Sequence, residues 1–433
     1  MLRGRVCQGG RYRRNEPRRG RMSAEESEAF SSREVAEMRS MLEGIRVIDF
    51  TNTVAGPGCT FFLADMGAEV IKVERPGLGD EARLFPPYKD GVSASFAVLN
   101  RGKRGVVLDL KQPRAVEVFK ELVAVSDVFV ENYRPGVMKK LGIDYDVLKE
   151  INPRLVMCSI SGYGQYGPLA HLPAYDAVLQ ALSGLMSTTG FPDGPPVRAG
   201  TLIVDISCAF YAAFGVCAAL FARERTGVGE YLDISMYDVA INLLEAKFVD
   251  YTVTGNIPRR TGNRYPYVTP FDTYRTGDGY VMIICVGDQP FHNLCRAMGR
   301  PELAEDERFR DLMARNANEP ALREIIEEWT SGLTNAEIWE LLQEYEVPGA
   351  PVNDVKSVVE NPHTAARGML VDLEQPGAGV ITIFGSAMKA LGSEIKPRGP
   401  APALGQDNRW LLEEVLGKSP READDILASG AMG

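Results

Sequence analysis

Short apolar runs alternate with helical stretches through the first half of the chain. The apolar runs, which have the character of strands, lie at residues 45–50, 70–74, 106–110, 128–132 and 155–160. Helical stretches separate them, and the repeat of about thirty residues is the size of a βαβ unit. Apolar strands that alternate with helices predict an α/β fold, with a Rossmann-like parallel sheet covered on both faces.

The second half of the chain has a different pattern. Helical stretches dominate at 175–186, 206–223 and 237–252. A segment rich in proline, glycine and arginine follows at 258–266, and this composition is typical of a linker. Beyond it, strands and helices alternate irregularly, which predicts a smaller α+β unit.

These patterns divide the chain into four parts. We predict a disordered or mis-assigned N-terminal arm at 1–41, a large Rossmann-like domain at 42–257, a linker with a small α+β domain at 258–370, and a return segment with a C-terminal helix that packs on the large domain at 371–433. The arm carries eight arginines within residues 1–21 against one acid, Glu16. No apolar stretch follows them, so the arm does not resemble a secretory signal.

The composition narrows the class of protein and its partners. The 433 residues are 45% hydrophobic and 24% charged, with a net charge of −10. Such a chain is typical of globular proteins, and nucleic acid or an anionic membrane is not the expected partner. The sequence contains no uninterrupted apolar run of about 18 residues, so it does not predict a membrane span. Seven cysteines without CxxC spacing and three scattered histidines indicate reduced thiols in the cytoplasm and no metal site.

Asp205 stands where a short apolar run ends and the long helical pattern of 206–223 begins. This position predicts an N-cap, whose carboxylate accepts backbone N–H bonds. Backbone amides and the helix dipole both favour the ionised form. An ionised carboxylate at such a place can attack a carbonyl carbon, but the position by itself favours a cap alone.

Ligands of parallel sheets bind beyond the carboxyl ends of the strands. That edge is expected to carry the small-residue turn at 53–58, Arg75, residues 132–134 and residues 161–166. The glycine turn is not a GxGxxG fingerprint and is a weak sign of nucleotide binding. Arg75 could meet a phosphate or could simply be a solvated strand end.

Longer motifs, in order between residues 42 and 417, carry a resemblance to a known family. They are VIDFT at 47–51, LADMGAEVIKVERP at 63–76, NRGKRGVVLDLK at 100–111, DVFVENYRPG at 127–136, SGYG at 161–164, AYDA at 174–177 and RTGVGE at 225–230. With these motifs the chain resembles the class III CoA-transferases, which include formyl-CoA:oxalate and carnitine CoA-transferases. In many members a Thr-Gly pair follows the catalytic aspartate after two intervening residues. This chain has Cys208 and Ala209 at those positions.

The resemblance implies a set of site residues. Asp205 matches the catalytic aspartate of the family. The residues that would bind the CoA substrate are Val54, Ala55, Arg75, Leu108, Asp109, Lys111, Asn132, Tyr133, Arg134, Lys140, Tyr175 and Asp176. Lys140 stands where related enzymes have arginine, which keeps the charge but loses the bidentate fork.

The resemblance also implies the reaction and the assembly. CoA would pass from an acyl-CoA thioester to a small carboxylic acid through an aspartyl anhydride and an aspartyl-CoA thioester. Acyl-CoA is then a substrate, and no cofactor or metal is needed. Two ring-like subunits would interlock as a homodimer. Asp205→Ala is expected to abolish transfer while CoA binding persists.

Two other functions stay open at this point. An α-methylacyl-CoA racemase shares the fold, but racemases carry a His-Asp pair where this chain has Tyr175 and Asp176, and tyrosine is a poor base at neutral pH. A non-catalytic CoA-binding subunit of a hetero-oligomeric transferase is the other alternative.

The sequence says less about which carboxylic acids exchange CoA. The formyl/oxalate branch has a glycine-rich loop with no clear counterpart between Gly255 and Gly279. This disfavours oxalate and leaves a small dicarboxylate, a carnitine-like acid or an aromatic acid. The arginines that could grip a substrate carboxylate are Arg198, Arg259, Arg260 and Arg264.

Overall fold

A six-stranded parallel sheet forms the centre of the protein in the computed structural model, which describes residues 40–433. Its strands are, in spatial order, β5 (Arg104–Val107), β2 (Glu69–Glu74), β1 (Arg46–Phe50), β6 (Val128–Glu131), β7 (Val156–Ser161) and β8 (Tyr231–Ser235). The predicted α/β fold with a parallel sheet is thus confirmed. Most of the predicted arm at 1–41 lies outside the described residues.

Neighbouring strand residues point to opposite sides of the sheet. Both faces are therefore apolar, and helices cover both of them. Val47 belongs to the core under helices α2 (Ala55–Asp65) and α8 (Ile203–Thr226). Ile48 belongs to the core on the other face, which includes α4 (Pro113–Ala124). The remaining helices around the sheet are α3 (Ala94–Asn100), α5 (Val137–Leu141), α6 (Tyr145–Ile151), α7 (Asp176–Leu182) and α9 (Met236–Asn242).

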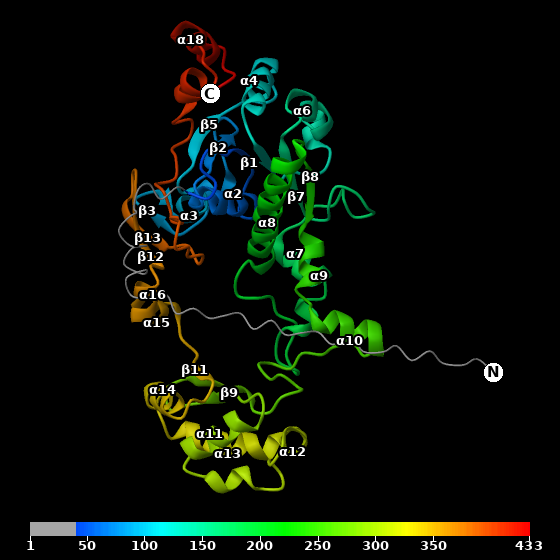
Figure 1. The fold of residues 1–433 in the computed structure, drawn as a ribbon, viewed down its shortest axis with the longest axis vertical. Coiled ribbons are helices and arrows are strands. Elements are labelled where there is room, and N and C mark those ends of the chain that lie inside the picture. The colour runs from blue at the N-terminus through cyan, green and yellow to red at the C-terminus, as the bar shows by residue number, and fades with distance from the viewer. Residues whose placement is uncertain (1–39) are drawn as a thin grey trace, which may run out of the picture.

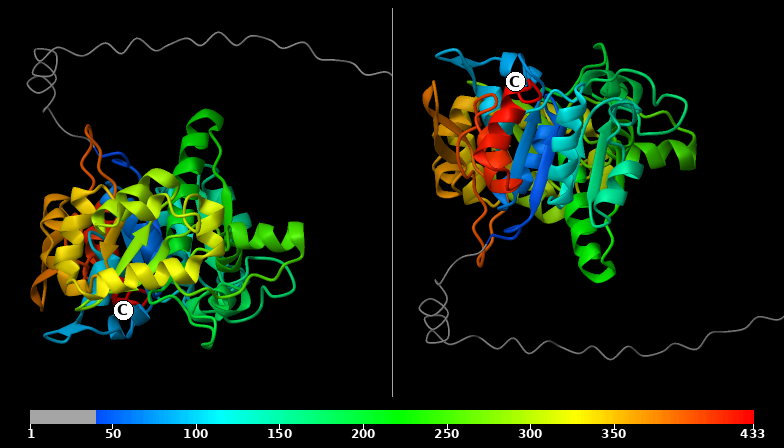
Figure 2. Two further views of the ribbon diagram at one scale, coloured as in Figure 1. Left: turned by 90° about the horizontal axis from the view of Figure 1, so that it is seen from below. Right: turned by 90° about the horizontal axis from the view of Figure 1, so that it is seen from above.

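The end of the chain returns to the sheet and completes this second core. Helices α17 (Asn408–Trp410) and α18 (Pro420–Ala428), joined by the η4 turn (Leu411–Val415), lie beside β5 and α4 (Figures 1 and 2). The Asp109 N–H donates to the Ala431 carbonyl over 2.9 Å. The sequence pattern predicts the terminal helix at 408–416, where α17 and η4 lie, and it does not predict α18 beyond them.

A second, smaller unit lies at the opposite end of the molecule from the C-terminus (Figure 1). Its antiparallel sheet has the order β11 (Gly349–Pro351), β10 (Tyr280–Ile284), β9 (Phe271–Arg275). Its helices are α11 (Asp288–Ala297), α12 (Leu312–Ala317), α13 (Glu319–Ser331) and α14 (Asn335–Glu344). These elements enclose an apolar core of their own, and two chain segments join the unit to the rest of the protein.

The chain also forms a hairpin and several short elements. They are β12 (Leu370–Gln375), β13 (Gly379–Phe384), α15 (Val355–Glu360), α16 (Pro362–Ala366), α10 (Ala246–Thr254), β3 (Tyr88–Lys89) and β4 (Val92–Ser93). The helix expected at 237–252 is in fact two helices, because Glu245 has a φ of +51° and interrupts the hydrogen-bond ladder between α9 and α10.

Helix α8 is long and apolar enough, by length and composition alone, to cross a membrane. It is nevertheless a core helix along one face. Cys208, Ala212 and Val216 are fully buried against α2 and the sheet. Phe214 and Phe221, on its outer face, are 75% and 68% exposed. Helix α8 is therefore apolar on two faces. One face packs in the core, and the other is exposed in a single chain.

A buried charge cluster lies below the carboxyl end of β1. The Lys103 ammonium donates to Asp49 Oδ2 over 2.8 Å, and Lys72 pairs with Asp80 over 2.8 Å. Burial opposes ionisation of Asp49, but Lys103 and Lys72 hold the pKa of this carboxyl well below its usual range. Burial lowers the pKa of Lys103 to about 8 in spite of Asp49. The four charges compensate one another without solvent.

Removal of one charge from this cluster should destabilise the fold strongly. Lys103→Met leaves the buried Asp49 carboxylate short of a partner, so the free energy of unfolding should fall by about 3 kcal/mol in urea denaturation. Lys149→Met, which breaks an exposed pair with Asp146, is the matched control and should cause no measurable loss. Equal effects of the two substitutions would contradict this account.

Candidate active site

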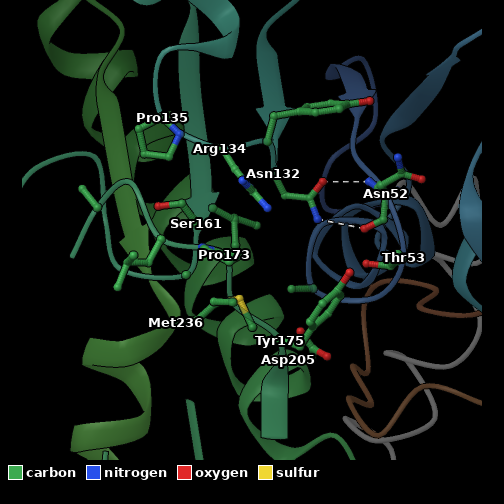
Figure 3. A pocket seen from close by; sticks show the side chains of 17 residues that line it. Asn52, Thr53, Asn132, Arg134, Pro135, Ser161, Pro173, Tyr175, Asp205 and Met236 are labelled. Carbon is green, nitrogen blue, oxygen red and sulfur yellow. Dashed lines mark hydrogen bonds between the residues drawn. The ribbon is translucent and has the colours of Figure 1, made fainter. Parts of the chain in front are cut away.

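A cavity of about 210 Å³ opens at the carboxyl ends of the central strands, the edge at which parallel sheets bind ligands (Figure 3). Its lining comes from the segments that follow β1, β6 and β7, from the start of α9 and from the first turn of α8. The lining residues are Asn52, Thr53, Ala55, Asn132, Tyr133, Arg134, Pro135, Ile160, Ser161, Gly162, Ala170, Leu172, Pro173, Ala174, Tyr175, Asp205 and Met236.

Two paired asparagines fix the wall formed by the ends of β1 and β6. The Asn52 N–H donates to Asn132 Oδ1 over 2.7 Å, and Asn132 Nδ2 donates to the Asn52 carbonyl over 2.8 Å (Figure 3). Thr53 then adopts a φ of +66°, and its N–H donates to Asp80 Oδ1 over 3.0 Å. Because Asp80 also pairs with Lys72, the buried charge cluster holds this turn in place.

Helix α2 begins earlier than the sequence pattern suggested. Residues 55–58 were expected in a turn, but α2 already starts at Ala55. The glycines are needed for close packing. A Cβ at Gly56 would lie 2.4 Å from Thr51 Cβ, and one at Gly58 would lie 2.9 Å from Ala209 Cβ in α8. No side chain among the described residues caps the start of α2, which faces the cavity at Ala55.

Asp205 lies in the first turn of α8, and the predicted N-cap role is wrong. The helix starts at Ile203, and Leu202 is at the N-cap position. The capping carboxylate comes from Asp176 at the start of α7. Asp176 Oδ2 accepts from the N–H groups of Val204 and Asp205 over 2.8 and 3.1 Å. Asp205 is thereby free to present its own side chain at one end of the cavity, beside Tyr175 (Figure 3).

The expectation that the local amides and helix dipole dominate the ionisation of Asp205 is also wrong. Burial, and then the charge of Asp176, raise the pKa of the Asp205 carboxyl to about 7. The amides that would have stabilised its charge are bonded to Asp176 instead. A carboxylate that is poorly solvated and half ionised near neutral pH is a more reactive nucleophile than a solvated one.

The structure brings about half of the expected site residues to the cavity. Those that line it are Ala55, Asn132, Tyr133, Arg134, Tyr175 and Asp205. Asp176 is buried directly behind Asp205. Val54 lines a separate, more apolar cavity with Leu202 and Ile206, on the other side of the α8 start.

The other expected residues lie outside the cavity lining. Arg75 is exposed and pairs with Glu81 over 3.3 Å, and Lys111 and Lys140 are exposed. Leu108 is buried, and the half-buried Asp109 accepts from the Lys111 N–H over 3.3 Å. The exposed basic side chains, Arg75 among them, could still reach the distal part of a long ligand.

Sequence reasoning missed several lining residues. Asn52 comes directly after β1, so the rule that ligands bind at strand ends could have found it, as it found Gly162 within 161–166. Met236 follows β8, whose place in the parallel sheet was not recognised. Residues 170–174 had no signal, because they form a loop without regular structure.

Fold and cavity together define a candidate active site in which a half-buried carboxylate lines a cavity at the edge of a parallel sheet. The sequence profile of CoA-transferase family III matches residues 42–408. The chain is 41% identical to the acetyl-CoA:oxalate CoA-transferase of Acetobacter aceti, over 88% of this chain and 97% of that one. It is also 41% identical to the succinyl-CoA:mesaconate CoA-transferase of Haloarcula hispanica, over 89% and 99%.

A crystal structure of a CAIB/BAIF family protein from Brucella suis superposes with a TM-score of 0.79 at 35% identity, over 87% of this chain and 99% of that one. The chain belongs to CoA-transferase family III. It is a class III CoA-transferase, as its motifs indicated.

The ionisation of Asp205 should control the pH dependence of its acylation. Only the carboxylate is nucleophilic, so the rate of adduct formation should rise with pH to a plateau, with a midpoint near the pKa of about 7. Asp176→Asn removes the neighbouring negative charge and should move the midpoint to lower pH. Rapid quenching with mass spectrometry measures the rate, and Asp146→Asn on α6 is the control. An unchanged midpoint in Asp176→Asn would be the contrary result.

Proposed function

We propose that Asp205 carries the transfer as a covalent nucleophile. The observation that supports this most directly is its position, at one end of a cavity at the strand ends, with a carboxyl whose pKa burial and Asp176 raise to about 7. Cys59, Cys158 and Cys208, the buried thiols nearby, have pKa values raised well above their usual range by burial and do not line the cavity.

The proposed reaction is a double displacement. An Asp205 oxygen attacks the acyl carbon of the donor, the C–S bond breaks, and CoA leaves as the thiolate, so that a mixed anhydride of the donor acid remains on Asp205. The thiolate attacks the Asp205 carbonyl carbon and releases the donor acid, which leaves an aspartyl-CoA thioester. The acceptor carboxylate attacks that thioester and expels the thiolate again. The thiolate then takes the acceptor acyl group, which regenerates Asp205. Thioesters are exchanged for thioesters, so positioning and exclusion of water matter most.

Donors for the tetrahedral intermediates are expected at the start of α2. The N–H groups of Val204 and Asp205 at the start of α8 already bind Asp176. The start of α2 carries no side-chain cap, and Ala55 lines the cavity. The N–H groups of Ala55 and Gly56, together with the helix dipole, suit a developing oxyanion.

The acids are proposed to be small carboxylates. The relatives named above act, by their names, on acetyl-CoA with oxalate and on succinyl-CoA with mesaconate. The expectation against oxalate stays a prediction.

A panel of acetyl-, succinyl- and aromatic acyl-CoA donors against mono- and dicarboxylate acceptors, followed by mass spectrometry, should show transfer. The same panel in deuterated water without acceptor should show no α-deuterium incorporation, whereas a racemase would incorporate it.

Loss of the Asp205 carboxylate should separate chemistry from binding. Asp205→Ala should lower transfer by about 10³-fold or more, because no covalent intermediate can form. Its affinity for CoA, measured by calorimetry, should stay close to that of the native chain. Hydroxylamine should trap an acyl adduct on the Asp205 peptide of the native protein and none in the variant. Native turnover by Asp205→Ala, or an adduct elsewhere, would contradict the proposal.

We further propose that the chain works as a homodimer. The phenylalanines Phe210, Phe214 and Phe221 are exposed on α8, and a group of large apolar side chains in solvent is typical of a protein–protein interface. Beside them, Met388 and Phe62 line an almost wholly apolar groove. A second copy of the chain is the occupant that the interlocked arrangement of the family implies.

The assembly can be measured directly. Light scattering should give twice the chain mass of 47.5 kDa. Phe214→Asp places a charge on the apolar face and should shift the population toward smaller or aggregated species. Lys149→Asp, on the exposed surface of α6, is the control. A native protein that scatters as a monomer at micromolar concentration would refute the homodimer.

A further inference from the structure

Gln180 is a fully buried amide one turn beyond Asp176 in α7. Its two ends have different partners. Nε2 donates to Asp176 Oδ1, and Oε1 accepts from the Ala199 N–H over 2.9 Å. A buried polar side chain costs free energy unless both ends are paired, and both ends of this one are.

We propose that Gln180 is a positioning residue for Asp205, an inference that rests on the covalent function proposed above. Asp176 holds the start of α8 through one oxygen, which accepts from Val204 and Asp205. Gln180 binds the other oxygen. Together these hydrogen bonds fix the plane of the Asp176 carboxylate, and through it the first turn of α8, from which Asp205 extends.

The second arm of Gln180 reaches the segment that leads into α8. Residues 190–202 have little regular structure, and Ala199 lies close before the helix. The far end of this segment is held from the linker: Arg260 Nη2 donates to the Gly194 carbonyl over 2.8 Å, and the Gly262 N–H donates to the Gly190 carbonyl over 2.9 Å. Gln180 therefore holds the near end of segment 190–202 through Ala199. The same side chain also binds Asp176, so it links this segment to the residue that caps α8.

Loss of the Gln180 amide should lower the rate of acylation and leave the affinity for CoA unchanged. An apolar side chain of similar length at 180 leaves Asp176 Oδ1 and the Ala199 N–H without their partner in a buried place. The start of α8 can then shift, and a misplacement of about 1 Å at a reacting group can cost on the order of 10²-fold in rate. Gln180 does not line the cavity, so CoA binding has no direct reason to change.

A matched pair of substitutions tests this. Gln180→Met removes the amide at nearly constant volume. The control is Gln375→Met on β12, where a buried glutamine also makes two hydrogen bonds, with the Ala401 carbonyl and N–H, each 3.0 Å long. Single-turnover acylation by acetyl- or succinyl-CoA, CoA affinity by calorimetry and thermal unfolding are measured on both purified full-length variants.

Gln180→Met should acylate at least ~10-fold more slowly than the native protein, with CoA affinity within ~3-fold. Gln375→Met should lose stability without that split between rate and affinity. A rate loss no larger than that of Gln375→Met, or a parallel loss of CoA affinity, would overturn the proposal. Should Gln180→Met not fold, Gln180→Asn gives the same readout, because its shorter amide cannot reach both partners. Absence of any Asp205 adduct in the native protein would instead refute the covalent function.

Discussion

The hydrogen bonds from the start of α8 to the Asp176 carboxylate govern both the architecture and the chemistry of this site. They provide the cap that α8 lacks in its own sequence, and they place a second negative charge next to Asp205. The backbone donors at the start of α8 bind the Asp176 carboxylate, so its neighbour Asp205 lacks them and lies in a poorly solvated place. Division of labour between two adjacent carboxyl groups is a general way to obtain different reactivities from one residue type.

The opposite wall of the cavity depends on a different principle, the mutual compensation of buried charges. Lys72 and Lys103 meet Asp49 and Asp80 below the strand ends, and Asp80 in turn holds the strained turn at Thr53. Hydrogen-bonded elements therefore support the cavity from both sides, and the loop at 170–174 contributes to its lining. A site that must keep water from an anhydride benefits from such fixed walls.

Much of the fold was predictable because the strands are continuous apolar runs, as parallel strands buried on both faces must be. The misses have physical causes. Gly56 and Gly58 resembled a turn, but they are small because α2 packs closely on Thr51 and on Ala209. Asp205 resembled a cap because capping rules consider only neighbours, whereas its cap partner lies 29 residues earlier in the chain. Its raised pKa arises from tertiary burial, which no local pattern encodes. The motifs identified the family, yet they did not distinguish residues at the cavity from those beyond it, such as Lys140.

The return of the chain end to β5 has a consequence for biosynthesis. Ile426 and Met432 belong to the same apolar core as Val106 and Ile71, which a ribosome makes some three hundred residues earlier. Until residues 408–433 have been made, one flank of the central sheet stays uncovered, and its apolar side chains are available to chaperones or to wrong partners. The intervening small unit, with its own core, can meanwhile fold by itself as the nascent polypeptide emerges.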